Sequence, residues 1–154
     1  MAMNPDTLLP AVFEGHDRLL ALVAHLTDDT AREPSRLPGW SRAHVLSHIE
    51  GVSRALARQT RYALKDELID PYGGGRPARD AAIEAGASRT ARELTHAVSV
   101  ALAETREAWS AVGPQDWGRA VRYRDADVAA VLLSWWRELE IHTADADLGY
   151  GSSD

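Results

Sequence analysis

The sequence predicts an all-α fold in which one domain, residues 1–154, forms a four-helix bundle. Apolar residues recur every three or four positions in four long stretches, which is the period of amphipathic helices. The connections between these stretches differ in length, and no segment has the pattern of a convincing strand. A chain of 154 residues with 45% apolar residues has room for one core of ordinary size.

The first helix is predicted over residues 6–26. Its inward stripe consists of Leu8, Leu9, Val12, Phe13, Leu19, Leu20, Val23 and Leu26. The segment DDTAREPSRLPGW that follows is rich in turn-forming residues and predicts an irregular connection. The second helix begins at Ser41, whose side-chain oxygen suits the free amides of a first turn, and runs to about Lys65. Its inward residues are Val45, Ile49, Val52 and Leu56.

Residues 69–87 begin with a segment rich in Gly and Pro, DPYGGGRP. We interpret them as an ordered loop with a functional face, in which residues 78–84 could form a short helix. Thr90 and Glu93 then have the spacing of a capping box, which predicts the start of a third helix. The Gly-Pro pair at 113–114 ends that helix.

A fourth helix is predicted near the C-terminal end of the sequence. Asp125 or Asp127 caps its start, and Gly149 closes it at a position that tolerates a left-handed backbone. Its inward stripe consists of Val128, Val131, Leu132, Trp135, Leu139 and His142. Residues 120–123 could form a short strand, but one strand cannot make a sheet.

Charge and composition exclude several classes of function. The net charge is −6, and acidic and basic residues are interleaved, so no Lys/Arg stripe is present to neutralise phosphates. Nucleic acids and anionic membranes are therefore not expected partners. No apolar run approaches the roughly 20 residues that span a bilayer, and we expect a cytoplasmic protein. The sequence has no cysteine, so any sulfur chemistry must use a thiol from another molecule.

The strongest chemical signal lies on the predicted fourth helix. Glu138 and His142 are four residues apart, so their side chains rise from adjacent turns of one face. That face is the inward one, because Val131, Trp135 and Leu139 share it. A carboxylate or imidazole among such residues must be paired, hydrogen-bonded or bound to a metal to offset its desolvation.

A second pair of histidines lies on the predicted second helix. His44 and His48 form an H-x-x-x-H pair, and either could meet Glu138 and His142 across the bundle. Two imidazoles and one carboxylate match a catalytic zinc ion that keeps an open coordination position.

Simpler interpretations of these residues stay open. Glu138 could instead pair with Arg92, Arg106 or another cation, and a buried histidine is more often a satisfied core residue than a ligand. Trp135 and Trp136 are expected to serve in packing. The remaining histidines, His16, His25 and His96, belong to no motif and are taken as ordinary residues.

Three segments, in order along the chain, resemble the mycothiol-dependent maleylpyruvate isomerases and their DinB-like relatives. LPGWSRAHVLSHI, residues 37–49, is similar to the L-x-G-W-[ST]-R-x-H-[VL]-x-x-H segment of that family. RPARDAAIEAGA from Arg76 resembles its A-R-x-x-x-I-x-x-G stretch, and RELEIHTADADLG from Arg137 resembles its R-E-V-x-[VI]-H-x-x-D-L-G helix. The resemblance implies a DinB-like metal-binding four-helix bundle.

The resemblance also implies roles for individual residues. It selects His48, together with Glu138 and His142, as the three zinc ligands. His44 matches a histidine that is not a ligand in the family and would instead help to orient the ligands.

Two further matches concern the substrate. Arg79 corresponds to an arginine implicated in catalysis, and it is suited to hold a substrate carboxylate. Tyr72 corresponds to a tyrosine that precedes this arginine and is assigned to substrate binding. Trp40 and Trp135 are both considered as walls of the site, without a preference.

The activity that the resemblance implies is zinc- and thiol-dependent cis-trans isomerisation. Mycothiol would enter the open zinc position, lose its proton and add to the double bond of maleylpyruvate. Rotation about the former double bond and release of the thiol would then give fumarylpyruvate. The expected partners are thus a small-molecule substrate and a low-molecular-weight thiol, and a homodimer is left open. A mycothiol S-transferase and a non-catalytic bundle that binds a metal or ligand are the alternatives.

The sequence departs from the family pattern in two places. The characterised isomerases carry a second, C-terminal domain, whereas this sequence ends at Asp154. The ending HTADADLG is two residues longer than the H-x-x-D-L-G of the family.

Overall fold

The computed structural model describes residues 4–71 and 74–150. Four long helices form the body of the molecule: α1 (Pro5–Val23), α3 (Arg42–Ala63), α5 (Ala91–Ser110) and α6 (Val128–Asp145). Two shorter helices, α2 (Asp28–Arg32) and α4 (Gly75–Ala87), and a 3-10 turn at Tyr123–Asp125 complete the described elements. The predicted all-α four-helix bundle is therefore confirmed.

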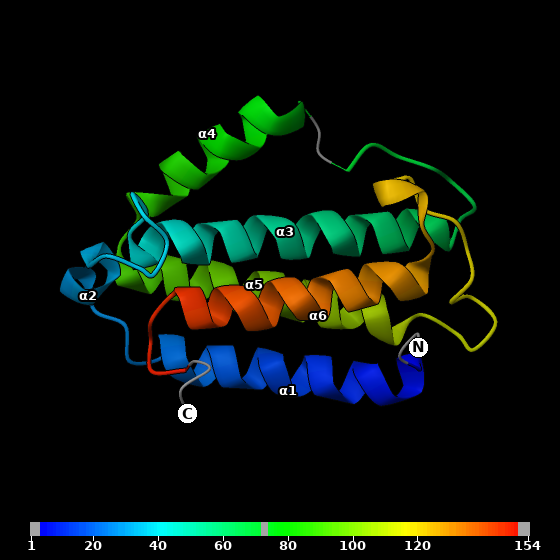
Figure 1. The fold of residues 1–154 in the computed structure, drawn as a ribbon, viewed down its shortest axis with the longest axis horizontal. Helices are drawn as coiled ribbons and strands as arrows, with labels where there is room; N and C mark the ends of the chain where they lie inside the picture. Colours follow the sequence, from blue (N-terminus) through cyan, green and yellow to red (C-terminus); the bar gives the residue numbers. More distant parts are fainter. Residues whose placement is uncertain (1–3, 72–73, 151–154) are drawn as a thin grey trace.

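The four long helices lie side by side, and α4 lies across the outside of α3 (Figure 1). Helix α3 contacts α5, α6 and α4, while α1 contacts α6 and α5, so the order around the bundle is α1, α6, α3 and α5. The pair α1 and α6 runs in one direction and the pair α3 and α5 in the other (Figure 1). Two parallel neighbours need a long connection, and α4 forms part of the one that joins α3 to α5.

The helices begin where side-chain caps are available. The Ser41 hydroxyl accepts from the backbone N–H of His44 at the start of α3, and the Thr90 hydroxyl accepts from that of Glu93 at the start of α5. Of the two aspartates proposed for α6, Asp127 is the cap. Each cap satisfies an amide that has no partner within the helix.

The core lies along the axis of the bundle and contains most residues of the predicted stripes; Leu9, Phe13, Leu20 and Leu26 are only partly buried against it. Val45, Ile49, Val52 and Leu56 of α3 are all buried. The largest fully buried apolar side chains are Trp109, Trp135, Leu8, Leu19, Leu46, Ile49, Leu56, Leu94, Leu102, Leu132 and Leu139. Removing such side chains from water is the main stabilising contribution to a bundle of this size.

Two predicted irregular segments contain more helix than expected. Helix α2 lies within the segment predicted as a connection, because Thr27 and Thr30 form a reciprocal capping box. The segment predicted as a loop with a short helix at 78–84 contains the 13-residue helix α4. Burial of Ile83 and Ala87 stabilises that helix beyond what its Gly- and Pro-rich start suggests.

The end of α6 differs from the prediction. The helix ends at Asp145, before Gly149. Gly149 does have a positive φ of 105°, but Asp147 already adopts a left-handed φ of 58° nearer to the helix end. Residues 120–123 form no strand, and the described residues contain two isolated β-bridges, Pro34 with Ser41 and Ala120 with Asp127.

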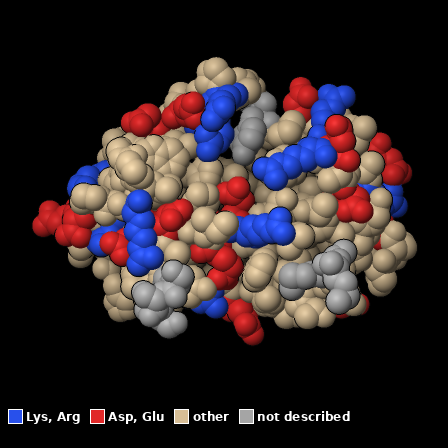
Figure 2. Space-filling model, in the orientation of Figure 1, with Lys and Arg blue, Asp and Glu red and all other residues tan. Residues whose placement is uncertain are grey.

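The surface agrees with the predicted absence of a basic stripe on the face that Figure 2 shows. Lys and Arg side chains are interspersed there with Asp and Glu. Among the described helices, none combines the length and apolar character that crossing a bilayer requires.

Candidate metal centre

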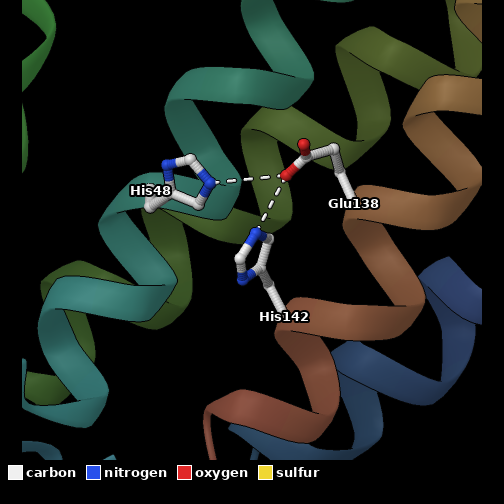
Figure 3. A group of neighbouring side chains, drawn as sticks. All are labelled: His48, Glu138 and His142. Carbon is white, nitrogen blue, oxygen red and sulfur yellow. Dashed lines mark ion pairs between the residues drawn. The ribbon is translucent and has the colours of Figure 1, made fainter. Parts of the chain in front are cut away.

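The packing of α3 against α6 brings His48, Glu138 and His142 to one place (Figure 3). Glu138 and His142 lie one turn apart on α6, so the helical repeat alone aligns them. His48 comes from α3, across the interface between α3 and α6, and its side chain is 8% exposed. Within the described residues, this is the one group of three side chains with the composition and spacing of a metal site.

The three possible ligand atoms converge around one carboxylate oxygen. His142 Nε2 lies 2.9 Å from Glu138 Oε2, and His48 Nε2 lies 3.5 Å from the same oxygen. All three atoms lie within 4.8 Å of one another, and the two imidazole rings meet edge to face with centroids 4.6 Å apart. Glu138 Oε2 is buried, yet no described group meets it in hydrogen-bond geometry.

The charges at this site favour a carboxylate anion. The close approach of His142, and then of His48, holds the pKa of Glu138 well below its usual range, against the opposing effect of burial. Burial lowers the pKa of His142, but contacts with Glu138 and Asp145 outweigh it and raise that pKa. Glu138 is therefore a persistent negative charge with a buried, unsatisfied oxygen.

These residues fit a zinc ion. Donor atoms at about 2 Å from a tetrahedral ion are about 3.3 Å apart, which the two nitrogen–oxygen spacings of 2.9 and 3.5 Å approach; the two nitrogens lie within 4.8 Å of each other. The unsatisfied Oε2 is the kind of buried polar atom that requires an explanation, and a cation would supply one. Two imidazoles and one carboxylate would leave one position open on such an ion.

Asp145 is a site residue that the analysis of motifs missed. Its Oδ2 lies 3.0 Å from His142 Nδ1, so the ring nitrogen donates its proton to the carboxylate. This contact orients the ring and leaves the Nε2 lone pair directed toward Glu138 and His48, as carboxylates behind metal-bound histidines do. The three-residue spacing of His142 and Asp145 on one helix was the available signal.

Arg79 comes from α4 and contacts His48 at Nδ1, the ring nitrogen that does not face Glu138. Its Nη2 donates to His48 Nδ1 at 3.0 Å, and its Nη1 donates to Asp80 Oδ1 at 2.9 Å. Because a guanidinium can only donate, His48 Nδ1 accepts, and a neutral ring then carries its proton on Nε2. A metal on Nε2 would require that proton to be on Nδ1, and Arg79 would then have to give up this hydrogen bond.

His44 lies next to the site without touching the three converging side chains. Its Nδ1 accepts from the Ser41 backbone N–H at 3.2 Å, and its Nε2 lies 3.3 Å from the Glu84 carboxylate. Trp40 stacks on the His44 ring, with centroids 6.2 Å apart, and contacts His48 at 5.7 Å. Trp40 thus contacts the rings of both histidines.

Several sequence hypotheses have a definite outcome in the structure. Trp135 does not wall the site: it is fully buried in the core and donates to His16. Arg106 pairs with Asp17 and not with Glu138. Tyr72 lies outside the described residues. Of the two histidines considered on the second helix, His48 is the one beside Glu138.

Comparison with known proteins gives the family. The family model described as "Mycothiol maleylpyruvate isomerase N-terminal domain" matches residues 12–147. No curated protein matches the chain. Two solved structures have the same fold with a TM-score of 0.86 each: the mycothiol-dependent maleylpyruvate isomerase, at 22% identity over 96% of this chain, and a histidine-to-alanine mutant of it, at 21% over 97%.

The chain spans 61–62% of the length of those two solved chains. Their fold is shared, whereas their identity to this chain is low. The match of the family model covers most of the chain. The chain therefore belongs to the family of the mycothiol maleylpyruvate isomerase N-terminal domain.

Proposed function

We propose that this protein is a zinc-dependent enzyme that uses mycothiol to isomerise a cis double bond, with maleylpyruvate to fumarylpyruvate as the reaction to test first. The observation that carries the proposal is the convergence of His48 and His142 on a buried carboxylate oxygen of Glu138 that no described group meets in hydrogen-bond geometry. Membership of the family supports the choice of thiol and substrate.

The chain's own residues would prepare the site for a metal and a thiol. His48, Glu138 and His142 would hold the zinc ion, and Asp145 would keep the proton of His142 on Nδ1. When bound, a zinc ion with an open position lowers the pKa of a thiol that enters it, so that a thiolate forms at neutral pH. The chain contains no cysteine, so the thiol must be a separate molecule.

The reaction itself needs no oxidant or reductant. The thiolate sulfur forms a bond to one alkene carbon, and the alkene electron pair moves to the conjugated carbonyl oxygen as an enolate. The former double bond is then single and rotates. The enolate electrons return, the carbon–sulfur bond breaks, and the thiolate leaves with the alkene in the trans form. Arg79 would bind a substrate carboxylate and stabilise the enolate charge.

A second candidate is a mycothiol S-transferase, in which the thiol stays bonded to the substrate in the product. Among the described residues that line the cavity next to His48, Arg79 is the one cationic side chain. Maleylpyruvate carries two carboxylates, so a different electrophile with one carboxylate would match this charge better. In a transferase the carbanion formed by addition takes a proton, and the carbon–sulfur bond persists.

Purified protein would be incubated with zinc, mycothiol and maleylpyruvate while the ultraviolet spectrum and the free thiol are followed. We expect a spectral change to the trans product at constant thiol concentration. Omission of zinc or of mycothiol should abolish the change.

The outcomes separate the candidates. Loss of free thiol in proportion to substrate would support the transferase. Zinc bound at one ion per chain with no turnover of maleylpyruvate, and no consumption of thiol with other electrophiles, would instead support a non-catalytic metal-binding bundle. No bound zinc would overturn the metal site itself.

A further inference from the structure

A narrow cavity of about 200 Å³ lies between α3 and α4, next to the candidate metal centre. Each helix contributes positions one turn apart. The lining residues are Ser47, His48, Gly51 and Val52 of α3, and Ala78, Arg79, Ala82 and Ile83 of α4. We call this cavity the α3–α4 slot. Its polar end is formed by His48 and Arg79, and most of its other walls are small or apolar.

The two helices pack closely near the C-terminal end of α4 and diverge from there, which leaves the slot between them. Near the C-terminal end of α4, a Cβ at Gly86 would lie 2.6 Å from Ser47 Oγ, so the helices are in contact there. Arg89 ties this end to α3 by donating to Glu50 Oε2 at 2.7 Å. Toward its N-terminal end α4 rises away from α3 (Figure 1).

Small side chains keep the wider part of the slot open. A Cβ at Gly51 would meet nothing within 4 Å, so the space in front of this residue is empty of protein atoms. Ala78 and Ala82 line the slot from α4 and remain exposed. Larger residues at these positions would fill the slot without disturbing the buried contacts of Ile83.

Among the described lining residues, Arg79 gives the slot one positive charge, at the end next to His48. The Arg79 side chain is 25% exposed, and it uses two N–H groups for Asp80 and His48. A guanidinium has five N–H donors, so donors remain for a ligand carboxylate. A partly desolvated guanidinium beside an apolar channel is complementary to a carboxylate that bears an apolar chain.

The volume limits the size of such a ligand. A cavity of about 150 Å³ accommodates a molecule of the size of benzene. A slot of about 200 Å³ therefore suits a short carboxylic acid with a tail of a few carbons. In that position the carbons next to the carboxylate lie beside His48, at the edge of the candidate metal centre.

We propose that the α3–α4 slot binds short α,β-unsaturated monocarboxylates, with the carboxylate on Arg79 and the apolar tail between Gly51 and Ala82. The slot prefers these ligands to dicarboxylates of equal size, because it offers one cation and an apolar channel. The expectation that the ligand is α,β-unsaturated, and can therefore accept a thiolate, rests on the proposed function. The preference for a monocarboxylate with an apolar tail does not.

Binding is tested with two probes that have the same number of non-hydrogen atoms. The purified chain, in buffer with zinc and without thiol, is titrated with trans-2-hexenoate and with fumarate by isothermal calorimetry. We expect hexenoate to bind about tenfold or more tightly than fumarate, because its tail carbons leave water. Equal binding, or tighter binding of fumarate, would overturn the preference.

Variants locate the ligand. Gly51→Leu and Ala82→Leu fill the slot from opposite helices and should each weaken hexenoate binding by about tenfold or more. Ala81→Leu, an identical change at an exposed position of α4 outside the slot, should leave it unchanged. Arg79→Met should weaken both probes. Circular dichroism and zinc content of each variant identify any that are misfolded.

Failure of this proposal and failure of the proposed function are distinguishable. Unchanged hexenoate binding in both folded leucine variants would refute the slot, whatever the enzyme does with maleylpyruvate. Conversely, slot binding with the predicted pattern but without thiol-dependent turnover would refute the proposed activity and leave the slot as a carboxylate site.

Discussion

Helix α6 presents polar side chains on two of its faces, fully buried on one and half-buried on the other, in opposite electrostatic settings. Toward α1, Trp135 Nε1 donates to His16 Nε2 at 3.0 Å, and both residues are almost completely buried. Toward α3, Glu138 and His142 meet His48. The first pair is neutral and leaves the buried His16 Nδ1 without a described hydrogen-bond partner, whereas the second group combines a carboxylate with two imidazoles around an oxygen that also lacks one.

The difference shows when a buried histidine is a candidate ligand. No described carboxylate forms an ion pair with His16, and burial, assisted by the charge of Arg106, lowers its pKa to about 4 despite the opposing charge of Asp17. His142 is half-buried, and Glu138 and Asp145 raise its pKa against the opposing effect of that burial. A buried imidazole is a candidate metal ligand where a carboxylate orients its ring and another carboxylate lies next to its second nitrogen. We therefore expect the α1 side to serve stability and the α3 side to hold the proposed metal ion.

The largest expected effect comes from the α1 side. Trp135→Ala should lower the free energy of unfolding by about 3–5 kcal/mol, because it leaves a cavity in the core and removes the hydrogen-bond donor to His16. Chemical denaturation measures the loss. The folded variant should still bind zinc with the affinity of the unaltered chain. Loss of zinc binding without loss of stability would contradict the assignment of stability to the α1 side and of metal binding to the α3 side.

The second effect is a pH dependence that belongs to His16. Its pKa is lowered on folding from 6.5 to about 4, so the unfolded chain takes up this proton more readily than the folded one. The contribution is therefore fully present above pH 6.5 and is lost as the pH falls toward 4, by about 3 kcal/mol in total. Denaturation at several pH values measures it.

His16→Gln is the matched control for that measurement. The glutamine oxygen can accept from the Trp135 indole but does not titrate in this range. The difference in stability between the unaltered chain and this variant should change across pH 4–6.5. A constant difference would show that His16 is not buried as a neutral ring.

On the α3 side, Glu138→Ala should reduce zinc affinity by about a hundredfold or more, since it removes the charged ligand. Competition with a chromogenic chelator measures the change. Helical circular dichroism should stay close to that of the unaltered chain, because Glu138 is not part of the apolar core.

Glu140→Ala is the matched control on the same helix. Glu140 points toward α1, where it accepts from Arg18 at 2.9 Å. This variant should keep its zinc affinity, and equal losses in the two variants would argue against Glu138 as a ligand.

The smallest effect concerns Arg79. Its hydrogen bond to His48 Nδ1 holds the ring proton on Nε2, the atom that a metal would need. Arg79→Ala should therefore raise zinc affinity by a few-fold, while binding of carboxylates and turnover are lost. Lower zinc affinity in this variant would mean that Arg79 supports the ligands and does not compete with a metal.

The parts of the fold that could be predicted are those set by neighbouring residues. The Thr90 and Glu93 capping box and the stripe from Val45 to Leu56 were correctly predicted, because caps and amphipathic periods act within one or two turns. Helices α2 and α4 were underestimated. Ile83 and Ala87 of α4 are buried, and this burial comes from a part of the chain distant in sequence.

The candidate site divides in the same way. The sequence by itself determined that Glu138 and His142 share one face, since a four-residue spacing aligns side chains on any α-helix. Spacing left His44 and His48 as equal candidates, and the family resemblance selected His48. Tertiary structure alone decided how close His48 lies to Glu138 and that Arg79 reaches its Nδ1.

Tertiary structure also decided that Trp135 meets His16, 119 residues away. Such contacts depend on the rotation and inclination of each helix against its neighbours. Those angles follow from the packing of the whole core, which no local spacing contains.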